Sequence, residues 1–357
     1  MKRLLFLTTI IYPSNLANRV HVINMCKAFT EVGFDVTLFA SNVDIESTYK
    51  IVNTNSKKLL ISAIRILQKS MFIDVDLIYC REPRLMAVVI LFNFLIRKRV
   101  SYCFEIHDEP HTALDKFLLK FIFYFSNVVI TLNDNLKDYV IKNFGSRLES
   151  LIVVLPDGVD LGLYQTESKP QNLFFLENTN PVVIYTGSFI WWKGVTTVID
   201  AARKLPQVNF VFLGGREEEI KKIVSDNQDL KNIYLLGHKE FTSMPKYLSN
   251  ADICVLPNSK KVKVSEQYTS PLKMFEYMAS GKPIIASNLS SIRQILHDGE
   301  NAILFDPDNS DDLSRKIDML LNTPDIAKRI SIKARHDVEQ YTWKSRAAKI
   351  KSVILND

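Results

Sequence analysis

The stretch Ser270 to Ser287 reads SPLKMFEYMASGKPIIAS and places a helical pattern directly before a strand pattern. Leu272, Phe275 and Met278 recur at helical spacing, and the short apolar run 283–286 that follows is typical of a buried strand. Helices that alternate with such strands are characteristic of parallel sheets with crossover helices. We therefore interpret this stretch as one helix–strand unit of an α/β fold.

The same alternation extends along the chain in two series of similar length. This pattern predicts two doubly wound parallel-sheet domains facing each other across a cleft, with ligands bound beyond the carboxyl ends of the strands. The first series has candidate strands at 3–9, 35–40, 77–80, 101–106, 127–131 and 151–155 and helices such as 21–32, 84–97 and 113–125. The second has candidate strands at 182–185, 209–213, 233–236, 253–256, 283–286 and 302–305.

An irregular segment, LYQTESKPQNLFFLENTNP at 163–181, separates the two series. It mixes two prolines with polar residues and has no clear period, as interdomain linkers do. We expect a first domain over 1–165, a linker over 166–181 and a second domain over 182–342. A last helix near 343–357 is able to pack back on the first domain.

The composition is that of a globular protein and excludes disordered or fibrous classes. Of 357 residues, 47% are hydrophobic and 24% are charged. The net charge of +6, from 45 basic and 39 acidic residues, is too small and too scattered to indicate nucleic-acid binding. It suits an anionic substrate or a membrane surface. The longest apolar run, 85–96, is shorter than the roughly 20 residues that span a bilayer.

Four cysteines lie far apart, with no Cys-x-x-Cys pair and no histidines at zinc spacing. We interpret them as reduced, buried residues of a cytoplasmic protein. The N-terminal stretch MKRLLFLTTIIYPSN has the charged start and apolar run of a secretory signal but lacks a small-residue cleavage site. A first strand explains it as well, and we favour the strand.

The start of the helix in the opening stretch is a candidate anion site. Ser270 fits an N-cap and Pro271 the first helical turn. Free N–H groups and a macrodipole of about half a charge suit a diphosphate there. Lys273 adds a cation, and Glu276 is placed to accept hydrogen bonds from sugar hydroxyls. An ordinary capped helix explains the same residues equally well.

A second candidate site follows the first strand of the second series, in the stretch YTGSFIWWKGV at 185–195. Gly187 allows a tight turn, and Lys193 stands before an amphipathic helix, where its ammonium can reach a phosphate. The adjacent Trp191 and Trp192 either stack on a sugar or pack within the protein. Glycine turns occupy the equivalent places after the next two strands, at Gly214-Gly215 and Gly237-His238.

In the first series, polar residues follow strands at the edge expected to face the same cleft. His107 comes directly after a strand, and a histidine there can donate to a phosphate or sugar oxygen, or it can cap the next helix. Further polar groups at this edge are Arg81, Glu82 and, in the loop before the first helix, Asn15, Asn18 and His21. These groups suit an acceptor without identifying it.

The segment 49–73 is basic and amphipathic. It has five basic residues and no acidic ones, and its apolar residues fall along one helical side. Such a segment can lie on an anionic bilayer, and a solvated helix face is an equally good interpretation. The basic residues are Lys50, Lys57, Lys58, Arg65 and Lys69.

Together these residues resemble the retaining nucleotide-sugar glycosyltransferases of the GT-B fold, in particular family four of the group 1 transferases, over nearly the whole chain. FEYMASGKP resembles the second half of that family's Glu-x7-Glu signature, and Glu276 matches the second glutamate, which binds the donor ribose in such enzymes. The loop at Gly187 and Lys193 resembles the diphosphate loop, and His107 matches a histidine that approaches the transferred sugar. LPDGVD resembles the family's Pro-Asn-Gly-Val-Asp segment, with Asp157 in place of asparagine.

Two positions depart from the family pattern. Tyr268 stands eight places before Glu276, where the signature has its first glutamate, and Ser188 stands where many relatives have a diphosphate-binding arginine. Lys193, Lys273 and the helix start are then expected to neutralise the leaving group. The departures weaken any inference about which sugar is transferred.

The resemblance implies a hexosyltransferase with two Rossmann-like domains. It implies transfer of a hexose-type sugar from a UDP or GDP donor to a glycan or polyprenyl-linked saccharide, with retention, in cell-surface polysaccharide synthesis such as lipopolysaccharide or capsule. The expected catalytic residues are His107, Lys193 and Glu276. The expected donor contacts are Gly187, Ser188, Lys193, Gly214, His238, Thr269, Ser270, Pro271, Leu272, Lys273 and Glu276, and the expected acceptor-side residues are Asn15, Asn18, His21 and Arg81.

We expect no metal and no cofactor, because cations and N–H dipoles of the protein can hold the charge of the leaving group. Two Asp-x-Asp pairs, at 74–76 and 306–308, match the manganese-binding pattern of the other major transferase fold, and we interpret both as surface turns. The expected location is cytoplasmic, peripheral on the inner face of the plasma membrane. No nucleic-acid partner is expected.

Two other functions stay open at this point. A GT-B nucleotide-sugar epimerase would use several carboxylates around the cleft, and this sequence offers few. A catalytically inactive sugar-nucleotide-binding subunit is suggested by Tyr268 and Ser188, while the presence of Glu276 and Lys193 argues against it.

Overall fold

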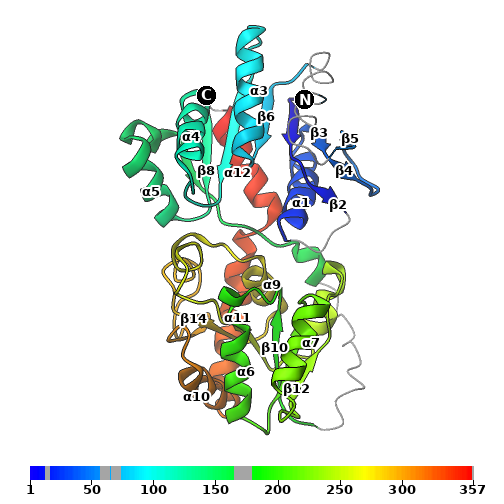
Figure 1. Ribbon diagram of the computed structural model, residues 1–357, viewed down its shortest axis with the longest axis vertical. Coiled ribbons are helices and arrows are strands. Elements are labelled where there is room, and N and C mark those ends of the chain that lie inside the picture. Colours follow the sequence, from blue (N-terminus) through cyan, green and yellow to red (C-terminus); the bar gives the residue numbers. More distant parts are fainter. Residues whose placement is uncertain (13–16, 57–64, 66–73, 165–178, 356–357) are drawn as a thin grey trace. The chain divides into compact units, whose positions relative to one another are not determined.

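The computed structural model describes residues 1–12, 17–56, 65, 74–164 and 179–355 (Figure 1). The chain forms two compact units: Met1–Asp157 together with Trp343–Asp357, here called unit 1, and Gly158–Thr342, here called unit 2. The expected linker 166–181 falls largely outside the described residues, so that boundary stays a prediction.

Unit 1 is built on seven parallel strands in the order β5-β3-β1-β6-β7-β8-β9. The central strands are continuous apolar runs, as in parallel sheets covered on both faces. All six strands predicted in the first series are present. The strands are β1 (Arg3–Leu7), β3 (Asp35–Ala40), β5 (Lys50–Asn53), β6 (Leu77–Cys80), β7 (Ser101–Ile106), β8 (Val128–Thr131) and β9 (Ile152–Val154), and β2 (Ile11–Tyr12) pairs with β4 (Asn42–Val43) in a separate two-stranded sheet.

The start of the basic segment 49–73 differs from the prediction. Lys50 lies in strand β5, which was not predicted and which pairs with β3 at the edge of the sheet. Arg65 donates hydrogen bonds to the backbone carbonyls of Thr54 and Asn55. The other basic and apolar residues of the predicted amphipathic side lie outside the described residues.

Two helices of unit 1, α4 and α5, start at capping residues that the sequence offers. Thr112 Oγ and Asn133 Oδ1 each accept a backbone N–H, at 3.0 Å, at the starts of α4 and α5. Helix α1 begins at residue 17, four residues before the predicted start, and α12 packs against it (Figure 1). The helices are α1 (Ala17–Glu31), α3 (Pro83–Leu95), α4 (Ala113–Phe125), α5 (Asp134–Phe144) and α12 (Trp343–Leu355), with a 3-10 turn η1 (Ser146–Leu151).

Unit 2 has six parallel strands in the order β12-β11-β10-β13-β14-β15, and all six were predicted. The strands are β10 (Val182–Thr186), β11 (Asn209–Leu213), β12 (Ile233–Leu235), β13 (Ile253–Leu256), β14 (Ile284–Ser287) and β15 (Ile303–Phe305). The helices are α6 (Val195–Lys204), α7 (Glu217–Asp226), α8 (Met244–Leu248), α9 (Leu272–Ser280), α10 (Ser310–Leu321) and α11 (Pro324–Asp337), with 3-10 turns that include η2 (Leu161–Tyr164) and η3 (Trp191–Lys193).

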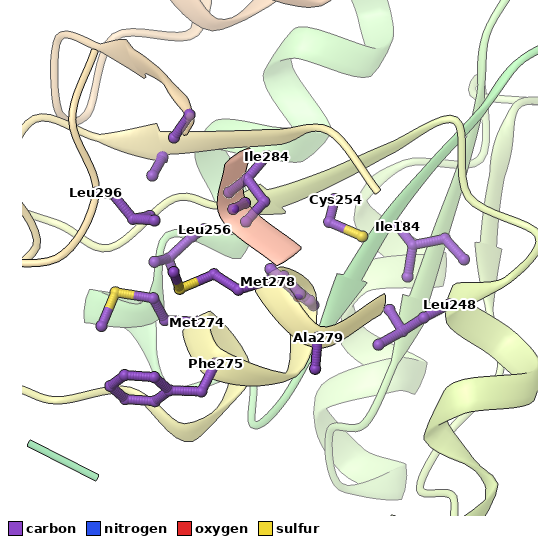
Figure 2. Close-up of a cluster of buried hydrophobic side chains, with 14 of the residues drawn as sticks. Ile184, Leu248, Cys254, Leu256, Met274, Phe275, Met278, Ala279, Ile284 and Leu296 are labelled. Carbon is purple, nitrogen blue, oxygen red and sulfur yellow. The ribbon is translucent and has the colours of Figure 1, made fainter. Parts of the chain in front are cut away.

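Helix α9 is embedded in the core of unit 2. Figure 2 shows its Met274 and Met278 among Leu256 of β13 and Ile284 of β14. Seven of its nine residues are buried. Each buried apolar side chain contributes about 1.5–3 kcal/mol, so the helix is held firmly in place. Any charged residue on it is therefore held in a fixed and largely dry position.

Each sheet has a topological switch point, where the strand order reverses direction from the first strand of the sheet. This point lies between β1 and β6 in unit 1 and between β10 and β13 in unit 2. Ligands of doubly wound sheets bind outside the carboxyl ends of the strands at this point. Arg81 directly follows β6 and Gly187 directly follows β10, so candidate residues in each unit occupy it.

Two further expectations concern membrane spans and thiols. Within the described parts of the chain, no helix combines the length and the apolar character needed to cross a membrane. The four cysteines are buried and free, as predicted.

Candidate functional site

Three glycine loops pack backbone against backbone at the carboxyl ends of β10, β11 and β12. The N–H of Gly187 donates to the carbonyl of Leu213 and that of Gly214 to the carbonyl of Gly237, both at 2.8 Å. Gly214 has a φ of +127°, and a Cβ there would lie 2.0 Å from the Gly187 carbonyl oxygen. A side chain is therefore excluded at Gly214, while Gly187 stays exposed at the end of its strand.

The ammonium of Lys273 lies against the Gly187 turn. Lys273 is 8% exposed, and its Nζ is 3.9 Å from the centroid of the Tyr185 ring. A Cβ built on Gly187 would lie 3.7 Å from the same Nζ. Within the described residues, this Nζ has no hydrogen-bond partner. Burial, and then the nearby charge of Lys193, lowers the pKa of Lys273 well below its usual range.

Lys193 is the second cation at this place. It ends the short turn η3, and its Nζ is 4.0 Å from the centroid of the Trp192 ring. Burial lowers its pKa to about 8. The next residue, Gly194, has a φ of +77°, and a Cβ there would meet the Pro257 carbonyl oxygen at 1.7 Å. Glycine is therefore required after Lys193. Trp191, in contrast, is 60% exposed.

The start of helix α9 differs by one residue from the prediction. The N-cap position is Pro271, with φ −71° and ψ 123°, instead of Ser270, and no side chain caps the helix. The extended backbone at Pro271 delays helical geometry until Leu272. Because no side chain caps them, the N–H groups of the first turn are available to an anion. The predicted helix start next to Lys273 is confirmed, and the predicted serine cap is wrong.

Glu276 lies one turn further along α9 than Lys273. It is 7% exposed, and burial raises the pKa of its carboxyl group to about 7, although Lys273 acts in the opposite direction. The raised value means that Glu276 changes charge near neutral pH. As a carboxylate it can accept hydrogen bonds from two adjacent hydroxyl groups. We call Lys193, Lys273, Glu276 and the Gly187 turn the lysine site.

The other donor-side predictions vary in exposure. Ser188 and His238 are exposed on the loops after β10 and β12, and Ser270 is 9% exposed just before α9. Tyr268 is 2% exposed, so the position that corresponds to the missing glutamate belongs to the core. Sequence reasoning missed Asn258 after β13, a fully buried amide with neither polar atom hydrogen-bonded among the described residues. Thr269 is partly buried, Pro271 is buried, and Leu272 is partly buried.

Unit 1 contains a network of buried charges centred on Glu105, the second-last residue of β7. Glu105 is fully buried, and its carboxylate lies 2.7 Å from His107 Nε2 and 3.0 Å from an Arg346 nitrogen. The hydroxyl of Tyr79 also donates to it. Burial raises its pKa, but Arg346, His21 and His107 together outweigh burial and lower the value to about 2. Glu105 is therefore an ionised, structurally central carboxylate.

His107 and Arg81 meet at the edge of this network. Arg81 Nε donates to His107 Nε2 at 2.6 Å, an Arg81 Nη lies 3.1 Å from His107 Nδ1, and the same Nε2 lies 2.7 Å from the Glu105 carboxylate. Burial and the charge of Arg81 lower the pKa of His107, and burial lowers that of Arg81 to about 10. Both side chains are partly buried at the carboxyl edge of the sheet.

His21 occupies a different place from the one predicted. It lies inside helix α1 instead of in the preceding loop, is 1% exposed, and its Nδ1 is 2.8 Å from Asp157 Oδ1. Burial lowers its pKa well below the usual range. Asn18 also lies in α1, and Asn15 is outside the described residues. His21 therefore supports the network from within unit 1.

Sequence reasoning also missed Glu105 and Arg346. Arg346 of α12 donates to the backbone carbonyls of Pro156 and Leu155, at 3.0 and 3.3 Å, and so holds the LPDGVD segment. An isolated charge inside the apolar strand SYCFEI was a signal for Glu105. Arg346 had no comparable signal, because its partners are far away in the sequence.

The network does not suit a metal ion. Ligand atoms of His21, Glu105 and Asp157 lie within 4.8 Å of one another. However, Arg346 and Arg81 lie 3.0 and 3.7 Å from the Glu105 carboxylate. A metal cation there would face two fixed positive charges, which already neutralise the carboxylate. The Asp-x-Asp pairs 74–76 and 306–308 take part in surface contacts with Arg3 and Lys260.

The family models that match this chain and the relatives that resemble it are all glycosyltransferases. The model "Glycosyl transferases group 1" matches residues 167–337, and "Glycosyltransferase Family 4" matches residues 19–163. An uncharacterized glycosyltransferase of Methanocaldococcus jannaschii is 23% identical, over 97% of this chain and 96% of its own length. The N,N'-diacetylbacillosaminyl-diphospho-undecaprenol alpha-1,3-N-acetylgalactosaminyltransferase of Campylobacter jejuni is 26% identical, over 63% of this chain and 59% of its own length.

Solved structures share the fold. HepE of Anabaena in complex with UDP and glucose has a TM-score of 0.81 at 18% identity and covers 100% of both chains. Sucrose-phosphate synthase from Thermosynechococcus elongatus has a TM-score of 0.81 at 16% identity and covers 100% of this chain and 99% of its own. At these identities the likeness concerns the fold, which is that of GT-B glycosyltransferases, as predicted.

Proposed function

We propose that this chain, which belongs to the group 1 glycosyltransferases, moves a hexose-type sugar from a UDP or GDP donor to a glycan or polyprenyl-linked saccharide, with retention. The similar HepE structure contains UDP and glucose, and the Campylobacter relative is named for a diphospho-undecaprenol-linked acceptor. We place the reaction in cell-surface polysaccharide synthesis, such as lipopolysaccharide or capsule, at the cytoplasmic face of the plasma membrane.

The lysine site carries this proposal. The ammonium of Lys273, which has no hydrogen-bond partner in the part of the chain that the structure describes, forms a positive site with the nearby Lys193 and the start of α9. A buried cation is costly unless an opposite charge is present. A nucleoside diphosphate supplies that charge, and its two phosphates match two cations and a helix start.

The proposed chemistry breaks the bond between the anomeric carbon and the diphosphate oxygen. Negative charge grows on the leaving diphosphate, so Lys193, Lys273 and the N–H groups of α9 stabilise the transition state more than the ground state. These groups do the work that a metal ion does in other transferases, and we propose that none is required. The acceptor hydroxyl oxygen bonds to the anomeric carbon from the face that the diphosphate leaves, and its proton passes to the departing diphosphate oxygen, which gives retention without a covalent intermediate.

Glu276 and His107 have different proposed roles. Glu276, one turn beyond Lys273, accepts hydrogen bonds from the ribose hydroxyls of the donor. His107 stands at the carboxyl edge of the unit 1 sheet, where Glu105 and Arg81 fix its ring. We propose that it contacts the transferred sugar, with Arg81 beside it on the acceptor side.

A nucleotide panel tests the proposal. Thermal shift and calorimetry with UDP, GDP, ADP and CMP are expected to show one preferred nucleoside diphosphate, and hydrolysis of the matching nucleotide sugar is expected to persist in EDTA. Binding without hydrolysis or transfer to any acceptor would favour an inactive sugar-nucleotide-binding subunit. The absence of binding by all four nucleotides would refute the donor site.

A further inference from the structure

Helices α3 and α4 lie side by side in unit 1 (Figure 1). Both expose large apolar side chains. On α3, Phe94 and Leu95 are 63% and 69% exposed. On α4, Phe117 and Tyr124 are 67% and 66% exposed, and their spacing of seven residues puts them on one side of the helix. Soluble proteins rarely expose contiguous apolar surface of this kind without a partner for it. We call this surface the α3–α4 face.

The two apolar stripes of the face meet at the C-terminal ends of the helices. The rings of Phe94 on α3 and Phe125 on α4 have centroids 5.9 Å apart, and Phe121 packs on Phe125 at 5.0 Å. Leu91 and Ile96, both exposed, extend the α3 stripe on either side of Phe94. The face is therefore continuous across both helices.

Most of the excess of basic over acidic residues falls in α3, the short segment after it, and α4. Residues 83–99 and 113–125 contain six basic side chains and one acidic side chain, out of 45 and 39, which leaves 39 basic and 38 acidic residues in the rest of the chain. The basic residues are Arg84, Arg97, Lys98, Arg99, Lys116 and Lys120, and the acidic one is Asp115. Arg97, Arg99, Lys116 and Lys120 are exposed, whereas Arg84 lies 3.6 Å from Asp115.

A groove of about 400 Å³ adjoins Phe117 and Tyr124, between α4 and η1. Its lining is mainly aromatic and aliphatic, with Lys120 and Arg147 among the lining residues. The Arg147 guanidinium lies over the Tyr124 ring, 5.0 Å from its centroid. An apolar trough flanked by two cations suits an acyl chain and its phosphate.

We propose that the α3–α4 face docks unit 1 on a bilayer that contains anionic phospholipid. The aromatic and aliphatic side chains enter the boundary between headgroups and acyl chains, and the lysines and arginines reach the lipid phosphates. This surface differs from segment 49–73, whose basic residues lie largely outside the described part of the chain.

A second copy of the chain fits this face poorly. A twofold contact places the same patch on both partners, so the exposed lysines of α4 in one copy would lie against those of the other. Like charges at such a contact repel, whereas an anionic bilayer attracts them. The location also suits an enzyme with a lipid-linked acceptor, because α4 begins six residues after His107. The docking proposal itself does not depend on nucleotide binding.

Vesicle flotation of the full-length protein tests the proposal. We expect recovery with vesicles of phosphatidylcholine and phosphatidylglycerol in a two-to-one ratio, at least tenfold lower recovery with phosphatidylcholine alone, and weaker binding at high salt. The triple variant Leu95→Ser, Phe117→Ser, Tyr124→Ser and the double variant Lys116→Glu, Lys120→Glu should each lower recovery at least tenfold. All five positions are on the surface, and circular dichroism melting checks that the variants fold.

Matched controls keep the test specific. Val224→Ser with Ile332→Ser removes exposed apolar side chains of unit 2, and Lys328→Glu with Lys349→Glu reverses exposed charges elsewhere, and both should bind as wild type. Binding that survives both α3–α4 variants but is lost on replacing the five cations of 49–73 would overturn the proposal. So would a dimer in analytical ultracentrifugation that the triple variant dissociates.

Discussion

The Lys273 ammonium lies over the Tyr185 ring, 3.9 Å from the ring centroid, and has no hydrogen-bond partner among the described residues. Lys273 stands in the first turn of α9 and Tyr185 in β10, so the packing that buries the helix also holds the cation. A ring face offsets only part of the cost of burying a charge. The arrangement favours the arrival of an anion.

Replacing Lys273 separates binding from stability. In Lys273→Met, we expect affinity for the preferred nucleoside diphosphate to fall at least tenfold, because one of two cations is lost. The melting temperature should not fall, since methionine fills similar space without a buried charge. Isothermal calorimetry and thermal melting measure both, with the exposed Lys261→Met as control. An unchanged affinity would place the diphosphate elsewhere.

Glu276 predicts a pH dependence of donor binding. Its pKa of about 7 means that the carboxylate that accepts ribose hydroxyls forms as pH rises from 6 to 8, which strengthens ribose binding. Lys193, with a pKa of about 8, begins to lose its charge over the same range, so the difference between the wild-type and Glu276→Gln profiles isolates the part due to Glu276. Glu276→Gln should bind more weakly and show a flatter profile over the same range. The measurement is calorimetric titration at several pH values. A wild-type profile as flat as that of the variant would contradict the assigned role.

The raised pKa of Glu276 also makes the stability of the protein depend on pH, and stability falls as pH rises. Because the folded-state pKa is raised above its ordinary value of 4.5, the free energy of unfolding should fall as pH rises from about 4.5 to 7. The variant Glu276→Gln should lose this part of the pH dependence. Urea titrations of both proteins between pH 4.5 and 7 test it, and parallel curves would count against the shift.

Glu105 and Arg346 should be energetically coupled. Either Glu105→Gln or Arg346→Met leaves a buried charge without its partner, which costs about 3–5 kcal/mol. The double variant should lose less than the sum of the two single losses. Urea unfolding measures all three, and additive losses would show that the pair is not coupled.

Acid should weaken this network in wild type. The pKa of Glu105 is lowered to about 2, so the stability that its charge contributes is present above about pH 4.5 and is lost as pH falls toward 2. Glu105→Gln should lack that part of the acid dependence. Unfolding curves of the two proteins between pH 5 and 2 provide the comparison.

Substitution of Gly214, with Gly145 as the control, tests whether the close backbone contact between the glycine loops is needed. Both have positive φ, +127° and +115°, but only Gly214 has a neighbour, the Gly187 carbonyl, within 4 Å of a built Cβ. We expect Gly145→Ala to cost about 1–3 kcal/mol of backbone strain. Gly214→Ala should cost more and also weaken nucleotide binding, because it displaces the Gly187 turn. Equal losses with normal binding would show that the close approach is dispensable.

Much of the fold could be predicted because helices and strands have local signals. Strands 77–80 and 101–106 and helix 113–125 have the predicted bounds, since apolar runs and periods lie within the elements themselves. Errors arose at ends and edges. The first helix begins earlier than predicted, and Lys50 lies in an edge strand whose pairing with β3 no local pattern shows.

The sequence predicted which positions form the candidate site, but it did not predict how deeply their side chains are buried or how their pKa values shift. Lys193, Lys273 and Glu276 follow strand ends or start helices, and such positions can be read from the pattern. Their altered pKa values come from burial, which depends on which segments cover them. Asn258 gave no signal, because an amide after a strand is ordinary until its surroundings are known.

The sequence by itself determined the order of strands and helices and the loops on which chemistry can occur. Tertiary structure alone decided that His21 meets Asp157, 136 residues away, that Arg346 reaches Glu105, and that the ring of Phe94 on α3 lies against that of Phe125 on α4. The physical reason is the range of the interactions. Periodicity and capping act within a few residues, whereas burial, ion pairing and surface composition depend on segments that only folding brings together.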